Sequence, residues 1–155
     1  MVTRNFLILL VVLLGVGCTP QCEKKNFGSK TAARAPLELK IEPLAEGSGP
    51  ELRTGQILHV HYRAWKIDTQ APDEKGDLIS DTYSKGAAQK IRFGKDELMQ
   101  GWAEGLPGMR SGSKRRLFIP ANMAFGDIGA GERIPKGTAL IYEIEVVALE
   151  DDTGK

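Results

Sequence analysis

The chain has 155 residues, of which 41% are hydrophobic and 26% are charged, and its formal net charge is +1. These values fit one globular domain and exclude a disordered tail protein, a collagen-like fibre and a polytopic membrane protein. The near-neutral charge argues against a nucleic-acid partner, because such binding needs an excess of lysine and arginine.

A short apolar run from Phe6 to Val16 follows Arg4 near the beginning of the chain. A helix needs roughly 20 apolar residues to cross a bilayer, so this run is too short to be a membrane span. A positively charged start, a short apolar stretch and small residues after it are typical of an export signal. We therefore predict that residues 1–17 are a signal peptide.

The residues Gly15-Val-Gly-Cys18 resemble the lipobox of bacterial lipoproteins, although the family usually has Leu where Gly15 stands. The resemblance implies that Cys18 becomes a lipid-carrying amino terminus. It also implies a location in the bacterial cell envelope, with the protein anchored to a membrane and facing the periplasm or the exterior. The alternative is an ordinary signal peptide cut elsewhere, with Cys18 and Cys22 paired in a disulfide.

Residues 18–36 contain several basic side chains, Gly, Ser and Ala, and little apolar content. Such a segment cannot bury enough apolar surface to fold by itself. We predict a flexible tether that holds the folded domain off the membrane, with a weak attraction to anionic head groups.

Apolar and polar residues begin to alternate at Leu37, which is the period-2 pattern of half-buried strands. The alternation and its Gly, Pro and Ser boundaries predict strands over residues 37–42, 58–64, 78–83, 90–93, 114–119 and 140–146. We place the folded domain at residues 37–151 and a short tail at 152–155.

Residues 96–105 break this period, because Leu98, Met99 and Trp102 fall on one helical face and Asp96 is placed to cap the first turn. So short a helix is marginal in water and must pack on a sheet. The prediction is an α+β domain in which one antiparallel sheet surrounds one helix.

Few residues carry reactive chemistry. His59 and His61 share a strand face with Arg63, but no further histidine or cysteine of the domain completes a zinc site. We interpret this face as solvated and expect neither a metal nor another cofactor. The basic run 114–116 is interpreted as a strand end in solvent.

The glycines of residues 126–137 do not form a dinucleotide-binding fingerprint, because Ile134 stands where that motif needs Gly or Ala. Long loops inside compact domains often shape a binding cleft. We predict that this segment is such a surface loop.

Five separated segments occur in the order and spacing of one known family: residues 60–62, 94–109, 112–120, 124–126 and 134–135. Over residues 37–151 the chain resembles an FKBP-type peptidyl-prolyl cis/trans isomerase. The resemblance implies a five- or six-stranded antiparallel sheet wrapped around one short helix, and a monomer. It implies an enzyme that isomerises X-Pro bonds of proline-containing polypeptides, here exported proteins.

The resemblance also assigns roles. Trp102 would be the floor of an apolar pocket, and the backbone N–H of Met99 would bind the substrate carbonyl. The implied catalytic residues are Trp102, Tyr62, Met99, Phe125 and Tyr142, and the implied substrate-binding residues are Leu98, Ile79, Ile134 and Phe93.

Three departures from the family pattern are visible. Ile79-Ser80 stands in place of Phe-Asp, Gln89 in place of an aromatic residue, and Phe125 in place of Tyr. These changes thin the aromatic wall and remove polar partners, so we expect weak binding of macrolide immunosuppressants. They leave open a non-catalytic chaperone or partner-binding module, and an insertion at residues 68–75 leaves open a surface-interaction device.

Overall fold

The computed structural model describes residues 38–153, whereas residues 1–37 and 154–155 lie outside the described part. The predicted signal peptide, the tether, Cys18 and Cys22 all fall in the undescribed part and stay predictions. Within residues 38–153 no helix has the length and apolar character needed to cross a membrane.

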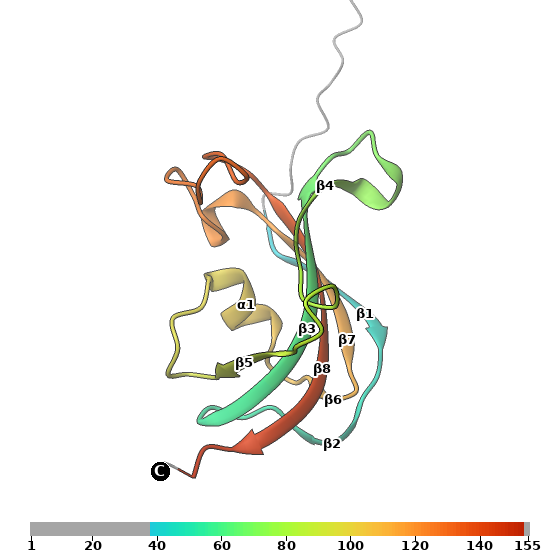
Figure 1. Ribbon diagram of the computed structural model, residues 1–155, viewed down its shortest axis with the longest axis vertical. Helices are drawn as coiled ribbons and strands as arrows, with labels where there is room; N and C mark the ends of the chain where they lie inside the picture. Colours follow the sequence, from blue (N-terminus) through green and yellow to red (C-terminus); the bar gives the residue numbers. More distant parts are fainter. Residues whose placement is uncertain (1–37, 154–155) are drawn as a thin grey trace, which may run out of the picture. The chain divides into compact units, whose positions relative to one another are not determined.

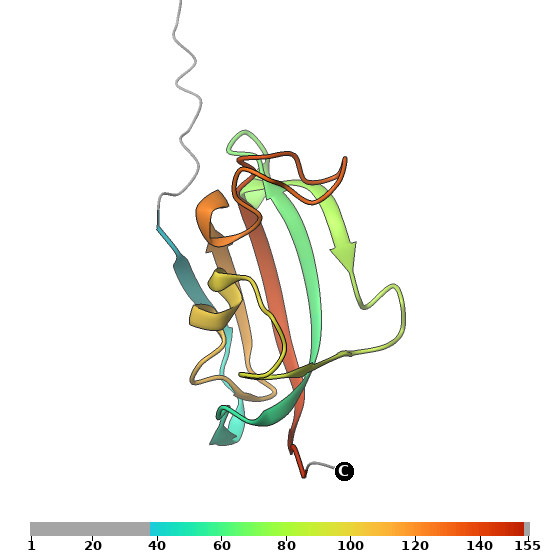
Figure 2. The ribbon, with the colours of Figure 1, turned by 90° about the vertical axis from the view of Figure 1, so that its left-hand side faces the viewer.

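Six strands form one antiparallel sheet in the order β1-β7-β8-β3-β4, and β5 pairs with β3 beside β4 (Figures 1 and 2). Their bounds are β1 Lys40–Ala45, β3 Gln56–Ile67, β4 Lys75–Asp81, β5 Gln89–Arg92, β7 Lys114–Ile119 and β8 Leu140–Asp151. A separate two-stranded sheet joins β2 (Ser48–Glu51) to β6 (Arg110–Ser111). The helical elements are α1 (Gln100–Gly105) and the 3-10 turns η1 (Pro72–Glu74) and η2 (Ala121–Met123).

The predicted fold class is confirmed: one short helix lies on one face of a curved antiparallel sheet, as Figure 2 shows. The core lies between this helix and the two long central strands, β3 and β8. Alternate residues of these strands, such as Leu58 and Val60 in β3 and Ile144 and Val146 in β8, are fully buried. The period-2 pattern therefore marks the buried face correctly.

The helix begins later than predicted. It starts at Gln100, and Met99 precedes it without a side-chain cap. The predicted cap, Asp96, is wrong, because its carboxylate accepts hydrogen bonds from the backbone N–H and the Nε of Arg92, both at 2.9 Å. Asp96 thus closes the turn after β5 instead of starting the helix.

Two glycines let α1 approach β7 closely. A Cβ atom added to Gly101 would collide with the Ile119 side chain, and one added to Gly105 would lie 2.6 Å from Leu117 Cδ1. Arg115 adds a polar clamp, since its Nη1 donates to Gly105 O at 2.9 Å and to Pro107 O at 2.7 Å. The prediction that Arg115 lies in solvent at a strand end is therefore wrong.

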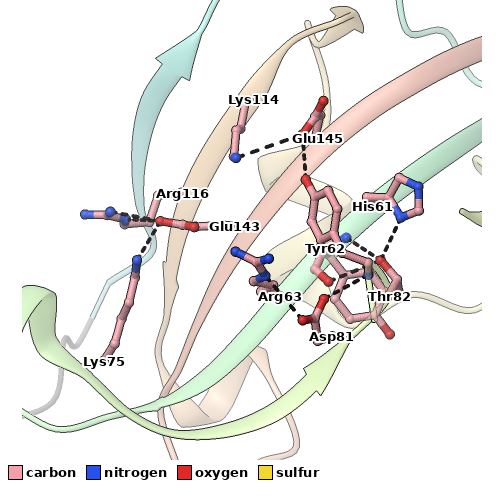
Figure 3. Close-up of polar contacts among 11 residues, drawn as sticks. His61, Tyr62, Arg63, Lys75, Asp81, Thr82, Lys114, Arg116, Glu143 and Glu145 are labelled. Carbon is pink, nitrogen blue, oxygen red and sulfur yellow. Dashed lines mark hydrogen bonds and ion pairs between the residues drawn. The ribbon is translucent and has the colours of Figure 1, made fainter. Parts of the chain in front are cut away.

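The outer face of the sheet, opposite α1, carries a network of ion pairs (Figure 3). Lys75 and Arg116 converge on the Glu143 carboxylate, with nitrogen–oxygen distances of 2.9 and 2.8 Å. Burial acts to raise the pKa of Glu143, but the hydrogen bonds and charges of Lys75 and Arg116 outweigh it and hold that pKa below its usual value. Arg116 is mostly covered by this network, which corrects the solvated interpretation of residues 114–116.

The histidine face of β3 is also more ordered than predicted. His61 stacks on Tyr83 with 4.7 Å between ring centroids, and the Arg63 guanidinium lies 4.8 Å from the same ring. The Tyr83 hydroxyl donates to Glu145 at 2.5 Å. His59 Nε2 lies 3.2 Å from Glu150 Oε2. These side chains pack on one another, so the face is not simply solvated.

Replacing Gly105 with Ala is expected to lower the free energy of unfolding by about 1–3 kcal/mol, because the new methyl group overlaps Leu117 in a close-packed contact. Thermal or denaturant unfolding followed by circular dichroism measures the change. The exposed neighbour Ala103 provides the control, and Ala103→Ser should change stability by much less. A Gly105→Ala protein as stable as the parent would show that α1 does not need this close approach.

Candidate active site

Strand β3 changes its partner along one edge. Residues 57–60 pair with β5, whereas residues 63–67 pair with β4. Tyr62 lies between these two stretches, where a gap in the ladder would leave its backbone unpaired. Thr82 fills the gap: its N–H donates to Tyr62 O at 3.0 Å, and its Oγ1 accepts from Tyr62 N–H at 2.8 Å. Thr82 is 4% exposed, so both bonds are shielded from water.

Three aromatic rings from three elements meet above the sheet. The Trp102 ring of α1 lies edge-on to Tyr62 of β3, with centroids 5.2 Å apart at 86°, and edge-on to Tyr142 of β8, at 5.3 Å and 89°. Each edge-to-face pair contributes about 0.5–1.5 kcal/mol beyond burial. Burial raises the pKa of Tyr142, so its hydroxyl stays neutral at physiological pH.

A hollow of about 280 Å³ opens over these rings. Residues from β3, β5, the turn before α1, α1 itself, the segment after η2, and β8 line it. They are Tyr62, Gln89, Ile91, Glu97, Leu98, Met99, Trp102, Phe125 and Tyr142. Trp102 is only 5% exposed and contacts both tyrosine rings, so it forms a buried floor rather than a rim.

The structure brings together all five residues predicted as catalytic, and Leu98 joins them in the lining. Ile79, Ile134 and Phe93 do not line this hollow. Ile134 belongs to the buried core, and the other two pack against it. Their predicted contact with substrate therefore stays a prediction.

Two lining residues, Ile91 and Glu97, were not predicted. Ile91 follows Gln89 by two positions on β5, so strand alternation places both side chains on the same face of the sheet. This two-residue spacing from Gln89 could have predicted that Ile91 lines the hollow. Glu97 lies in the irregular turn before α1, where no periodic pattern indicates which way a side chain points.

Two N–H groups at the hollow have no acceptor among residues 38–153. One is the buried indole Nε1 of Trp102, and the other is the backbone N–H of Met99, which precedes the first turn of α1. The first N–H groups of a helix have no partner within it. The described residues contain no cluster of three or more metal-ligating side chains. The hollow therefore offers a largely aromatic surface and a main-chain donor for a bound carbonyl.

An antiparallel sheet around one helix, with an open hollow floored by an indole, is the arrangement that the resemblance to FKBP-type peptidyl-prolyl isomerases implies. The family model described as FKBP-type peptidyl-prolyl cis-trans isomerase matches residues 49–147. The chain therefore belongs to the FKBP-type peptidyl-prolyl cis-trans isomerase family and is an enzyme of that type.

Similar proteins are bacterial and eukaryotic. An FK506-binding protein of Neisseria meningitidis serogroup B is 37% identical over 111 residues, covering 72% of this chain and 95% of the relative. An FK506-binding protein of Streptomyces anulatus is 34% identical over 115 residues, which cover 74% of this chain and 88% of the relative. Among solved structures, AtFKBP13 is 31% identical with a TM-score of 0.62, covering 74% of this chain and 94% of the other. FkpA from Escherichia coli shares the fold, at 23% identity and a TM-score of 0.64. The match covers 81% of this chain and 55% of the FkpA chain.

Replacing Thr82 with Val removes the acceptor for Tyr62 N–H and leaves that group buried without a partner. We expect a loss of about 1–3 kcal/mol in unfolding free energy. We also expect a several-fold lower kcat/KM for isomerisation of a proline peptide, because the Tyr62 wall loses its support. Thr82→Ser keeps the hydroxyl and should retain most of the activity. Equal activity of the Val and Ser variants would rule out this positioning role.

Proposed function

We propose that this enzyme is a lipid-anchored monomer that accelerates X-Pro isomerisation in exported proteins at the bacterial cell envelope. The observation that carries the catalytic part is the Trp102 floor, held edge-on by Tyr62 and Tyr142 beneath an open apolar hollow. The N-terminal apolar run and the cysteine at position 18 support the anchored, exported part.

The chemistry required is rotation, not bond cleavage. An amide resists rotation by ~18–20 kcal/mol because resonance keeps it planar. In the twisted transition state this resonance is lost and the bond becomes less polar. A hollow that excludes water therefore binds the twisted form more tightly than the planar one, and this difference lowers the barrier.

The geometry of the hollow supports the following roles. The proline ring packs on Trp102, between the rings of Tyr62, Tyr142 and Phe125, and Met99 N–H donates to the substrate carbonyl. One neutral hydrogen bond contributes only about 0.5–1.5 kcal/mol net, whereas each tenfold of rate needs about 1.4 kcal/mol. Most of the acceleration must therefore come from the apolar enclosure rather than from the Met99 bond.

A binding module with little turnover is the second candidate. It is favoured by the composition of the wall, in which Phe125 has no hydroxyl and the exposed Gln89 supplies an amide instead of a ring. Such a protein would hold proline-containing segments of a client without speeding their isomerisation. Measuring binding and turnover on the same protein separates the two candidates.

Replacing Trp102 with Leu should lower kcat/KM on a proline peptide by at least about tenfold, because the floor of the hollow loses its flat ring. Trp65 gives a matched control, since it is the other tryptophan of the chain and lies outside the hollow, beneath the Lys75 ammonium. Trp65→Phe should remain active. Circular dichroism confirms that both variants fold.

The Trp65→Phe protein also reports binding, because Trp102 is then its only tryptophan. Titration with a proline peptide should change the Trp102 fluorescence while line-shape or exchange NMR measures turnover. Binding without turnover would select the module and overturn the enzymatic proposal for this chain.

The proposed anchor depends on Cys18. In a bacterial host the mature protein should begin at Cys18, carry the additional mass of lipid, and sediment with membranes. Cys18→Ser should remove the lipid mass and release the domain, whereas Cys22→Ser should change neither. A mature protein without lipid, or with a Cys18–Cys22 disulfide, would contradict the anchor while leaving the isomerase proposal intact.

A further inference from the structure

A second hollow, of about 260 Å³, lies beside β4. Residues 78–81 of β4 form one side of it, the turn after β4 contributes Ser84 and Lys85, and Arg133 closes it from the loop that follows Phe125. None of these residues lines the proline hollow. The second hollow is therefore a separate feature from the aromatic site.

The charged side chains of the second hollow differ in whether they already have a partner of opposite charge. Asp81 is engaged, since its carboxylate accepts from Tyr83 N–H at 2.8 Å and from Arg63 Nε at 3.4 Å. Lys85 and Arg133 are exposed and form no ion pair with any residue from 38 to 153. Two cations without counter-ions therefore face a hollow whose single carboxylate is already used by other groups.

One hydroxyl group favours the same kind of ligand. Ser84 is not one of its donors, because its hydroxyl hydrogen already goes to Asp81 O at 2.9 Å. The Ser80 hydroxyl has no hydrogen-bond partner among the described residues and is free to donate. An arginine, a lysine and a free hydroxyl suit a carboxylate.

The second hollow is next to the proline site. Ser80 pairs with Ala64, which lies two residues beyond Tyr62 on β3, so Ser80 and Tyr62 share one face of the sheet. Arg133 immediately precedes the buried Ile134, and its loop begins at Phe125 of the proline hollow. A polypeptide whose proline lies over Trp102 can therefore extend across β4 into the second hollow.

We infer that Lys85 and Arg133 form a subsite for an acidic side chain of the client polypeptide, so that the enzyme prefers prolines with Asp or Glu nearby on one side. This inference rests on the proposed isomerase function and names a substrate class for it. Glu97 makes the preference directional. It lines the proline hollow and has no ion-pair partner among residues 38–153, so an acidic residue near it meets a like charge.

The test compares peptides that differ only in one residue, Glu, Gln or Lys, at each position within three residues of a central proline. The full chain is assayed for kcat/KM at low and at high salt. One position on one side of the proline should show Glu preferred over Gln by about two- to tenfold, as expected for two exposed ion pairs. The preference should weaken as salt screens the charges.

Variants connect the preference to the two cations. Lys85→Gln with Arg133→Gln should abolish the Glu preference, so that the Glu and Gln peptides have equal kcat/KM. Arg133→Glu should reverse the preference toward Lys. The matched control removes two other exposed charges, Arg53→Gln with Lys136→Gln, which lie outside both hollows and should leave the Glu preference intact.

Each outcome decides one proposal. Equal rates for Glu and Gln peptides at every position, or a Glu preference that survives the Lys85 and Arg133 changes, would overturn the acidic subsite while normal turnover kept the isomerase. If no peptide were turned over, the isomerase proposal would fail, and peptide affinities measured by calorimetry would still test the subsite. Tighter binding of Glu than Gln that needs Lys85 and Arg133 would then support it.

Discussion

Trp102 can form the floor of the hollow only because Gly101 and Gly105 let α1 lie directly against β7. A helix of six residues has no independent stability in water, so its position comes entirely from this contact. Larger side chains at either glycine would lift the helix off Ile119 and Leu117 and withdraw the indole from Tyr62 and Tyr142. Arg115 completes the attachment through the carbonyl groups at the end of the helix. The aromatic geometry is therefore a result of close backbone packing at Gly101 and Gly105, one and three residues from Trp102.

Strand β3 connects the two faces of the sheet. Tyr62 points to the hollow, whereas its neighbours His61 and Arg63 pack with Tyr83 on the outer face. Thr82 Oγ1 holds the Tyr62 backbone and lies 3.2 Å from His61 Nδ1 (Figure 3). The wall of the active site is thus supported by a polar network on the opposite side, not only by the core beneath it.

Alternation of apolar residues predicted the main sheet well, and strand 114–119 matches β7 at both ends. The small sheet was missed, because all four residues of β2 are exposed and show no alternation. The helix start was displaced because Asp96 binds Arg92, a contact that a capping pattern cannot distinguish from a true cap. Local sequence also could not show that Arg116 meets Glu143, because that pairing depends on strand register.

The residues of the site were likewise predicted only in part. The family resemblance located the residues that converge on Trp102, and it also named Ile79, Ile134 and Phe93, which do not line the hollow. Whether a residue lines a surface or supports it depends on side-chain direction in irregular segments, which neither period nor motif specifies. Sequence also could not show the second hollow, because residues 78–85 and the distant Arg133 form it together.

The free edge of β4 has a consequence for the contacts of this domain with other, extended polypeptide chains. An exposed strand edge is a template on which such chains can add as a further strand and begin to aggregate. In β4 two carbonyl oxygens are already occupied, Ile79 O by the Arg133 guanidinium at 3.4 Å and Asp81 O by the Ser84 hydroxyl at 2.9 Å. These side chains make the edge a poor partner for strand addition. The β4 edge is thus less able than an open strand edge to become the nucleus of a growing sheet.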